Sequence, residues 1–475
     1  MISSHKKLPL LITSLYTPWI LAVFFWESPI LSFWIAWLGS LFIFYQTWSS
    51  SLRFILPDFP VVEQNMRPIF LQQFIFAGFM CCTSIFYFLD TLGYVYFEKV
   101  ADVKPELIFD SLYILSKCQQ LSVLAHAAFV TGILILQRKH FYNRPRYILA
   151  KPIPQLQWLL IICIITFALS LMMQRISGLF QFSIGLYNVA IFSGSVIFIR
   201  GIRARKIGLT MWGAAVFLGN LINSTLTGYK EHIIVNCIIL TCLTYPYYKK
   251  TVLFIAVPCF FLLFYVLPTY AAIIRENAWT GNLTPQEARS AAIQSIFTDR
   301  DTYGDTNWSF LADRLSEIGM FTGYVATTPS KIPFYNLEIL KNSLSSIIPR
   351  TIWKDKPITE YLAMERVYDA GVVDVSSTVS AKTRPVVDGY LSAGMLGVFL
   401  YMLFLGILSQ TLSNFSENYL GGYEIGCVVF FNGFFQILWR GETMEFLLNS
   451  VFWSFVAMLC LFFIVKAAGF IQKVN

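Results

Sequence analysis

The sequence predicts an all-α polytopic membrane protein with about 12 transmembrane helices and one large helical extracytoplasmic loop. Composition is the first reason: of 475 residues, 56% are hydrophobic and only 13% are charged, whereas about 25% of the residues of a soluble chain are charged. The second is a series of apolar stretches long enough to cross a hydrocarbon core of roughly 30 Å as helices. The third is a single long polar segment, residues 269–385, between such stretches.

The apolar stretches divide the chain into three parts. Residues 1–268 form an N-terminal bundle of about nine spans, residues 269–385 form the loop, and residues 386–475 contain about three spans. The expected spans are 8–26, 29–48, 69–96, 107–137, 156–173, 179–199, 208–227, 232–247, 251–268, 386–410, 421–438 and 446–465. The assignment of residues 107–137 as a span is the weakest, because this stretch contains Lys117, Gln119, Gln120 and His126. An interfacial segment followed by a shorter span is the alternative there. No small-residue cleavage site follows residues 8–26, so we expect an uncleaved first helix.

The distribution of charge predicts the orientation of the spans. With the N-terminus in the cytoplasm and alternating loops, the cytoplasmic side contains 17 basic and three acidic residues. The basic residues are Lys6, Lys7, Arg53, Arg67, Arg138, Lys139, Arg144, Arg146, Lys151, Arg200, Arg203, Arg205, Lys206, Lys249, Lys250, Lys466 and Lys473, and the acidic ones are Asp58, Glu63 and Glu417. Because Lys and Arg concentrate in cytoplasmic loops, we expect both termini inside and residues 269–385 outside. The net charge of +8 then reflects topology, and no nucleic-acid partner is expected.

The polar segment has helical patterns of its own. Thr284–Glu287 reads as a capping box with Pro285 at the first helical position. Helices are also expected at residues 307–325, 336–348 and 357–370, each with an apolar face. The polar run at residues 374–383 is expected to be a flap. The sequence therefore predicts a folded helical cap.

Several classes of enzyme site are missing from the sequence. It contains no glycine-rich phosphate loop, no HExxH, no CxxC pair and no nucleophile elbow. The four histidines are His5, His126, His140 and His232, and only His232 is expected on the outer face. All nine cysteines lie in apolar stretches, so a disulfide scaffold is not expected in the loop. We expect neither a metal site nor a cofactor.

Arginine is the remaining chemical signal of the outer segment. Guanidinium groups bind phosphate oxygens in bidentate fashion. Most of these arginines, however, have an acidic residue nearby, and an ion pair with that residue is the alternative, structural interpretation. Arg350 and Lys356 stand apart because Pro349 and Pro357 bracket them beside Trp353. A plain surface turn would not need that arrangement, so function is favoured there.

Two sequence elements resemble a known family. The run SSIIPRTIWKDKP (345–357), preceded by TPSKIPF (328–334), resembles the PR-x-x-W-x-x-KP element in the outer loop of Wzy-type O-antigen and exopolysaccharide polymerases. LTGYKEHII (226–234) resembles a second element of that family, with Lys230 where arginine is usual. The architecture of many spans and one late outer loop is similar over nearly the whole chain.

The resemblance implies a glycosyltransferase of the bacterial cytoplasmic membrane. Donor and acceptor would be glycans linked to undecaprenyl diphosphate, with a chain-length regulator as a further partner. The site needs cations for the leaving diphosphate and a base for the acceptor hydroxyl. The candidate cations are Arg314, Arg350, Lys356 and Lys230, with Arg440 at the outer end of a late span beside Glu442. Glu317 is the first candidate base, with Glu231 and His232 as alternatives; a structural pair between Glu317 and Arg314 is the competing interpretation.

Two rival classes remain on sequence grounds. A flippase or transporter of lipid-linked sugars would favour charged residues inside spans and inverted repeats, which the sequence does not show. An O-antigen-ligase-like or other polyprenyl-linked transferase would differ from a polymerase only in its acceptor, which the sequence does not specify. A non-catalytic subunit of an export complex is a further alternative.

Overall fold

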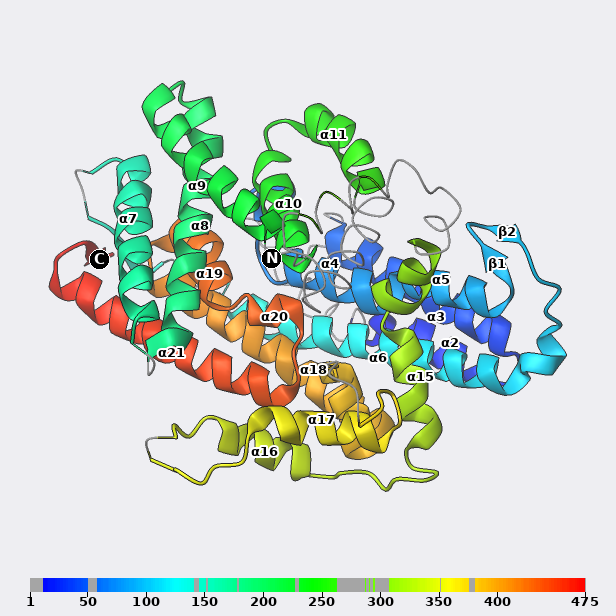
Figure 1. Cartoon of the computed structure of the whole chain (residues 1–475). Coiled ribbons are helices and arrows are strands. Elements are labelled where there is room, and N and C mark those ends of the chain that lie inside the picture. The colour runs from blue at the N-terminus through cyan, green and yellow to red at the C-terminus, as the bar shows by residue number, and fades with distance from the viewer. Residues whose placement is uncertain are drawn as a thin grey trace, which may run out of the picture. The chain divides into compact units, whose positions relative to one another are not determined.

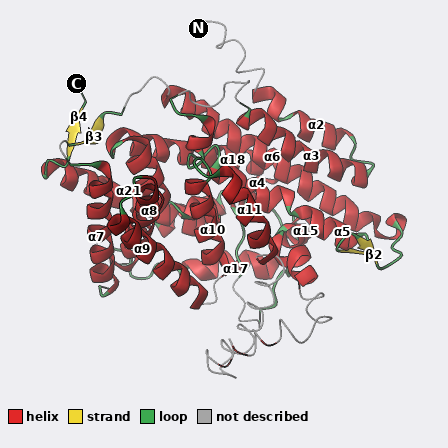
Figure 2. Ribbon diagram, turned by 90° about the horizontal axis from the view of Figure 1, so that it is seen from above, coloured by secondary structure: helices red, strands yellow, loops and turns green. Residues whose placement is uncertain are grey.

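The computed structural model shows a predominantly helical protein (Figures 1 and 2). The structure describes residues 12–49, 58–140, 145–150, 153–176, 179–226, 230–262, 287, 290, 294, 307–350, 352–375 and 381–474. Strands in this part of the chain are confined to two short antiparallel pairs, β1–β2 and β3–β4. The all-α class of the prediction agrees with this structure.

The chain divides into two compact units. The larger unit combines residues 1–150 with residues 316–475, and the smaller consists of Lys151–Leu315. Residues 316–385, the second part of the expected outer loop, therefore pack with the first and last spans of the sequence. The smaller unit includes α7 (Gln155–Gln174), α8 (Phe180–Arg203), α9 (Ile207–Leu226), α10 (Lys230–Thr244), α11 (Lys249–Phe261) and the π-helix η9 (Phe310–Leu315).

The larger unit contains the remaining elements. The N-terminal ones are α2 (Thr17–Phe24), α3 (Pro29–Trp48), η3 (Val61–Gln64), α4 (Leu71–Ala77), η4 (Gly78–Cys82), α5 (Ser84–Thr91), β1 (Tyr94–Val95), β2 (Glu98–Lys99), η5 (Pro105–Ile108), α6 (Phe109–His140) and β3 (Tyr147–Leu149). The C-terminal ones are α15 (Ile318–Thr327), α16 (Glu338–Ser346), α17 (Thr359–Asp369), α18 (Pro385–Tyr419), η10 (Tyr423–Phe431), α19 (Asn432–Phe434), α20 (Ile437–Arg440), α21 (Met444–Ala467) and β4 (Ile471–Lys473).

Eight helical stretches of the described chain are long and apolar enough to cross a membrane. They are Pro29–Trp48, Leu71–Thr91, Pro105–Gln137, Gln155–Gln174, Phe180–Arg203, Ile207–Ser224, Pro385–Tyr419 and Met444–Ala467. The predicted spans 232–247 and 421–438 correspond to shorter apolar helices, Ile233–Thr244 and Tyr423–Phe434. The predicted spans 8–26 and 251–268 lie partly outside the described residues.

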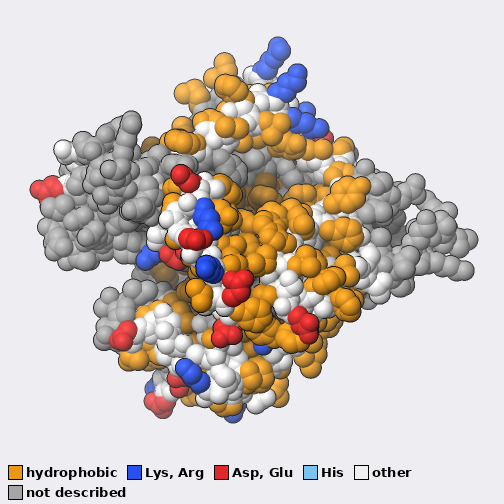
Figure 3. All heavy atoms as spheres, turned by 90° about the vertical axis from the view of Figure 1, so that its right-hand side faces the viewer, with side chains coloured by type: hydrophobic (Ala, Val, Ile, Leu, Met, Phe, Trp, Pro, Cys, Tyr) orange, Lys and Arg blue, Asp and Glu red, His pale blue; other side chains and the backbone are white. Residues whose placement is uncertain are grey.

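The surface of the molecule fits a membrane protein. Figure 3 shows a face covered largely by hydrophobic side chains, with the charged ones gathered in small patches. Large apolar side chains are exposed along the candidate spans, among them Leu38, Phe74, Leu396 and Phe463. Exposed apolar surface of this extent is unusual for a soluble monomer and expected where lipid is the solvent.

The core of the larger unit is the contact between α6 and α18. The sequence-based doubt about residues 107–137 is resolved by a single long helix, α6, whose face with Gln119 and His126 is buried. A Cβ added at Gly132 or Gly406 would collide with the backbone of the opposite helix. Glycine at both positions therefore allows the two backbones to touch, which is a common way for membrane helices to pack.

The start of α18 is bent sharply. Ala393 and Gly394 have non-helical backbone angles, and Gly394 has a φ of 59°, a conformation that favours glycine. Across the bend, Gly389 packs directly on Gly397. The short first segment thus folds back on the long second one, and Asp388 turns into the polar interior at this end of the unit.

Charged side chains are buried at both ends of α18. At its C-terminal end, Glu417 pairs with Arg67 at 2.9 Å, and Arg67 also pairs with Asp58 at 2.6 Å. At its N-terminal end, Asp388 pairs with Arg366 at 3.0 Å. The helix from the bend to Tyr419 spans roughly 35 Å at 1.5 Å per residue, so the two charged ends are separated by about the thickness of a hydrocarbon core.

Polar residues also join helices of the smaller unit. The Tyr187 hydroxyl donates to Asn220, and Asn220 donates to Asn236 at 2.7 Å. Asn236 in turn donates to Ser224. Asn220 and its partners therefore connect α8, α9 and α10.

Candidate functional site

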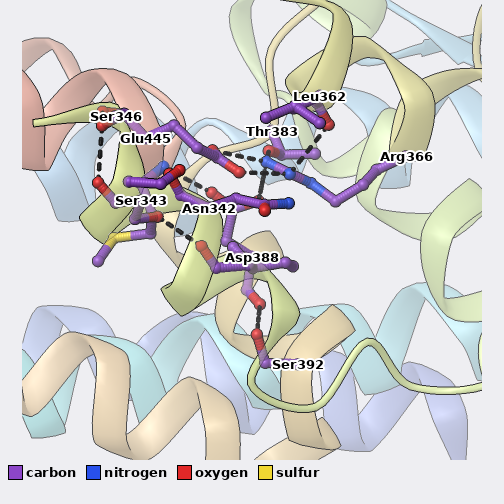
Figure 4. A network of polar contacts seen from close by, with 12 residues as sticks. Asn342, Ser343, Ser346, Leu362, Arg366, Thr383, Asp388, Ser392 and Glu445 are labelled. Atoms are coloured by element: carbon purple, nitrogen blue, oxygen red, sulfur yellow. Dashed lines mark hydrogen bonds and ion pairs between the residues drawn. The ribbon is translucent and has the colours of Figure 1, made fainter. Parts of the chain in front are cut away.

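A buried arginine organises one end of the larger unit. Arg366, on the inward face of α17, donates to Glu445 at 2.7 and 3.0 Å and to Asp388 at 3.0 Å (Figure 4). Its side chain is 3% exposed, and those of both acids are 0% exposed. Thr383 joins Arg366 to Asp388 through its hydroxyl. The cluster therefore ties α17, α18 and α21 together through charge-assisted hydrogen bonds, which are the strong ones in proteins.

Backbone groups complete this cluster. The second carboxylate oxygen of Asp388 accepts the backbone N–H of Met444 at 2.8 Å, at the first residue of α21. Ser346 at the end of α16 donates its hydroxyl to the carbonyl of Glu445 at 2.8 Å. Free N–H groups at a helix start favour an acidic partner. Asp388 thus fixes the start of α21 and holds Arg366 at the same time.

The segment before α18 alternates its side chains between two sets of partners. Thr383 points into the Arg366 cluster, while its neighbours Lys382 and Arg384 point elsewhere. Lys382 pairs with Glu442 at 3.0 Å and lies over the ring of Phe446. This alternation is what extended backbone produces, because successive side chains face opposite sides.

Arg384 forms the half-buried part of the site. Its Nε and Nη2 donate to the two carboxylate oxygens of Glu317 at 2.5 Å each. Its Nη1 donates to the backbone carbonyls of Arg440 and Gly441, and Gly441 has a φ of 62°, a conformation that favours glycine. The guanidinium also lies 5.2 Å from the ring centre of Phe79. One planar fork therefore holds a carboxylate on one edge and backbone oxygens on another.

The electrostatics of the site follow from burial and pairing. Burial alone would lower the pKa of Arg366, but Asp388 and Glu445 raise it overall, so the guanidinium stays charged. Burial and then the negative charge of Asp388 raise the pKa of Tyr324, so its phenol stays neutral. The Tyr324 hydroxyl is buried without a hydrogen-bond partner among the described residues. A neutral donor therefore lies near the carboxylates of the cluster.

The charged side chains of the site are paired with one another. Arg366, Lys382 and Arg384 form ion pairs with Glu317, Asp388, Glu442 and Glu445, and Arg440 contributes its backbone carbonyl. Among the described residues, no group of three or more His, Cys, Asp or Glu side chains is placed to hold a metal ion. The chemistry available is that of arginine, lysine and carboxylate.

The structure gives distinct roles to the predicted residues of the Pro-bracketed element. Lys356 donates to the carbonyls of Ser346 and Ile348, so it caps the C-terminal end of α16, where carbonyls lack helical partners. Burial and the nearby charge of Arg350 lower the pKa of Lys356. Arg350 itself is exposed, and no hydrogen bond or ion pair to its side chain is found within the described chain. Of the two, Arg350 is the one available to a ligand.

Glu317 and Arg440 are brought together with Arg384, a residue that the sequence analysis did not select. The predicted helix 307–325 is wrong in its continuity: η9 ends at Leu315, and α15 starts at Ile318. Glu317 lies in the turn between them, and its ion-pair partner is Arg384, 67 residues along the chain. Among the described residues, Glu317 therefore pairs with Arg384 and not with Arg314, the partner offered by the competing interpretation.

The other predicted site residues belong to the smaller unit. Arg314 is an exposed residue of η9. Lys230, Glu231 and His232 form the first turn of α10, and their side chains lie outside the described part of the structure. Their roles stay predictions.

Sequence reasoning missed Arg366, Asp388, Glu445 and Arg384. A signal was present for three of them. Asp388 lies in the first turn of the predicted span 386–410 and Glu445 directly before the predicted span 446–465, and an ionisable residue in a span is a functional candidate by default. Arg366 lies between Ala363 and Val367, both buried, on the apolar face of its helix.

Comparison with known proteins gives a family without a described activity. The chain matches, over residues 17–473, the family model described as "Domain of unknown function (DUF8712)". No curated protein and no solved structure matches it. Because the match covers nearly the whole sequence, the chain belongs to this family of unknown function, DUF8712.

Proposed function

We propose that this protein is a membrane glycosyltransferase that polymerises undecaprenyl-diphosphate-linked oligosaccharide repeat units into a surface polysaccharide. The observation that carries the proposal is Glu317, held by both edges of its carboxylate in the fork of Arg384. This pair is half-buried and lies beside Arg440 at one end of the spans. The resemblance of residues 345–357 to the outer-loop element of Wzy-type polymerases supports the same reaction.

The reaction requires little more than a base and cations. The acceptor hydroxyl oxygen attacks the anomeric carbon of the donor glycan while the bond from that carbon to the diphosphate oxygen breaks. The lipid diphosphate leaves with the electron pair of that bond, and the acceptor proton goes to a carboxylate. Positive groups fixed around the leaving oxygens stabilise the charge that develops there, and a positioned carboxylate accelerates the proton transfer.

Each role has a candidate among the described residues. Glu317 accepts the proton, and Arg384 sets the orientation of its carboxylate. A diphosphate that enters the site competes with Glu317 for the guanidinium of Arg384, because arginine forks bind phosphate and carboxylate alike. Arg350 and Arg440 are the further cations. Binding of the anionic donor thereby releases the base that the reaction needs.

The proposal includes an orientation in the membrane. The charge rule for loops favours a cytoplasmic location for both termini and an external one for residues 269–385. The Arg67 end of α18 contains residues assigned to the cytoplasm, and the Arg366 end contains residues assigned to the outside. The site would therefore face the periplasm or exterior of a bacterial cytoplasmic membrane, where a chain-length regulator would be its partner.

The decisive experiment is deletion of the gene followed by electrophoresis of the surface glycan. A polymerase predicts that the ladder collapses to a single repeat unit. Full-length chains left on the carrier lipid would indicate a ligase, and repeat units trapped in the cytoplasm would indicate a flippase. Either of the latter results would contradict the proposal.

Arg350 provides the matched test at residue level. Arg350→Ala and Arg350→Lys are compared with Lys104→Ala, another exposed basic residue of the same unit. Both Arg350 variants should shorten the ladder at equal protein level, because lysine keeps the charge but loses the planar fork. Lys104→Ala should leave the ladder unchanged. Normal polymer from Arg350→Ala would remove this residue from the site.

A further inference from the structure

Helix α16 has exposed leucine side chains on its outer face. Leu344 is 55% exposed and Leu337, directly before the helix, is 74% exposed, while Ile339 and Ser343 on the inward face are buried. Ile348 continues the exposed stripe, which follows the spacing of one helical face. A helix at a water-exposed surface shows the opposite arrangement, with its apolar stripe toward the core. The exposed stripe of α16 therefore needs an apolar environment of its own.

The contacts of α16 place it against the side of a candidate span. The indole Nε1 of Trp453 donates to the carbonyl of Ile347 at 3.1 Å. Trp453 is nine residues beyond Met444, about 13 Å along α21. Helices α16 and α21 are in contact along the same side of the larger unit, and Figure 1 shows α16 next to the N-terminal part of α21. The stripe thus meets the exposed apolar surface of that span, where Phe452 is also exposed.

Basic and aromatic side chains follow the stripe. After Pro349 the chain turns, with the backbone N–H of Trp353 bonded to the carbonyl of Pro349. Arg350 and Lys354 are exposed in this turn, as are Ile352 and Trp353. Apolar and aromatic groups beside exposed cations are the composition of segments that lie at a membrane surface.

We propose that residues 337–358, the interfacial segment, lie within the membrane interface, with the stripe of α16 among acyl chains and Arg350 and Lys354 at lipid phosphates. Thr351 in this segment is outside the described residues. We assign the bilayer as the partner that covers the stripe, because the stripe lies next to the exposed apolar surface of a candidate membrane span. The polar interior face of the segment meanwhile stays attached to the Arg366 cluster through Ser346. Part of the expected outer cap is then immersed in lipid.

Photocrosslinking in the intact protein tests the position of the stripe. The photoreactive residue p-benzoylphenylalanine replaces Leu344 in one variant and Ser330, an exposed residue of the turn after α15, in the control. After illumination in lipid vesicles, mass spectrometry should find lipid adducts at position 344 and none at position 330. Adducts to another protein at position 344, or equal lipid adducts at both positions, would overturn the proposal.

A second arm tests the basic side chains. Vesicles are prepared with and without phosphatidylglycerol, and the anionic lipid should be enriched among the adducts at position 344. The double substitution Arg350→Gln, Lys354→Gln should lower that enrichment by about fivefold for each lost charge while total lipid adducts persist. Unchanged enrichment in the double variant would refute the proposed contact of Arg350 and Lys354 with lipid phosphates. Loss of enrichment on adding inorganic phosphate, at constant ionic strength, would show a free-phosphate site instead. Neither arm depends on glycosyltransferase activity, so its outcome is separate from that of the proposed function.

Discussion

The substitution Arg366→Met tests whether the buried cluster stabilises the end of the larger unit. Methionine replaces the aliphatic part of the arginine side chain and removes its charged guanidinium group. Asp388 and Glu445, both 0% exposed, would then face each other without a counter-charge. Arg366 would lose one hydrogen bond to Asp388 and two to Glu445. Breaking a buried ion pair by removing one partner costs about 3–5 kcal/mol, a large share of the roughly 5–15 kcal/mol that stabilises a typical protein.

Thermal denaturation of the purified full-length protein in mild detergent measures this loss. The midpoint should fall by roughly 10 °C, since about 1 kcal/mol corresponds to a few degrees in a large domain. Lys99→Met is the control because Lys99 and Asp102 form an exposed pair, and such pairs contribute at most about 1 kcal/mol. The control should melt within a degree or two of the parent protein.

A compensating variant separates charge from packing. In the triple variant Arg366→Met, Asp388→Asn, Glu445→Gln, no uncompensated charge remains, and Asp388→Asn keeps an acceptor for the Met444 N–H. Much of the lost stability should return, as for other buried ion pairs replaced by neutral groups. If Arg366→Met melts like the control, the cluster does not stabilise this end of the molecule and the reasoning is refuted.

Four further predictions follow from the same structure. Glu317→Gln keeps the shape of the side chain but removes the base, so polymer formation should fall by about 10²-fold or more at equal protein level; retained activity would assign the base elsewhere. Gly406→Val should disrupt the contact of α6 with α18 and abolish folded protein in size-exclusion chromatography; a normal profile would disprove the close approach. In a cysteine-free background, an impermeant maleimide should label a cysteine at Ser330 but not at Gln472 in intact cells; the reverse would invert the topology. Polymerisation by purified protein should persist in excess EDTA, because arginine and lysine supply the positive charge; activity restored only by Mg²⁺ would contradict this mechanism.

The sequence predicts local elements of the outer segment well. Helices expected at residues 336–348 and 357–370 correspond to α16 (Glu338–Ser346) and α17 (Thr359–Asp369). Proline and glycine boundaries determine these ends, and such signals act within a few residues. The interruption at Glu317 had no local signal that we recognised, and its side chain pairs with Arg384, 67 residues along the chain. Long-range pairs of this kind leave no periodic trace in one sequence.

Only part of the candidate site could be predicted from the sequence, because its residues pair over long distances along the chain. Glu317 and Arg440 were selected, whereas Arg384, the residue that joins them, was not distinguished from the other arginines of the segment. Asp388 was treated as part of the span 386–410, and Glu445 was left directly before the span 446–465. The bend at Gly394 is what returns Asp388 to the polar end of the unit, and a hydropathy pattern does not reveal that bend. Lys356 was predicted to bind phosphate, but the structure gives it carbonyl partners.

The two charged ends of α18 suggest how a site whose cations are already paired would still accept an anionic lipid under the proposed function. At the Arg67 end, Glu417 and Asp58 hold a guanidinium that also lies over the ring of Tyr423. That cluster fixes the helix at one end and has no exposed cation built into it. At the other end, the fully buried Arg366 cluster fixes the helix in the same way, which leaves the half-buried Arg384 free of that structural task. Under the proposed function, an anion would exchange with Glu317 at Arg384 without unfolding the end of the unit, since the ties of α17, α18 and α21 run through Arg366. The proposal therefore predicts that substitution of Arg366 lowers stability, whereas substitution of Arg384 lowers activity.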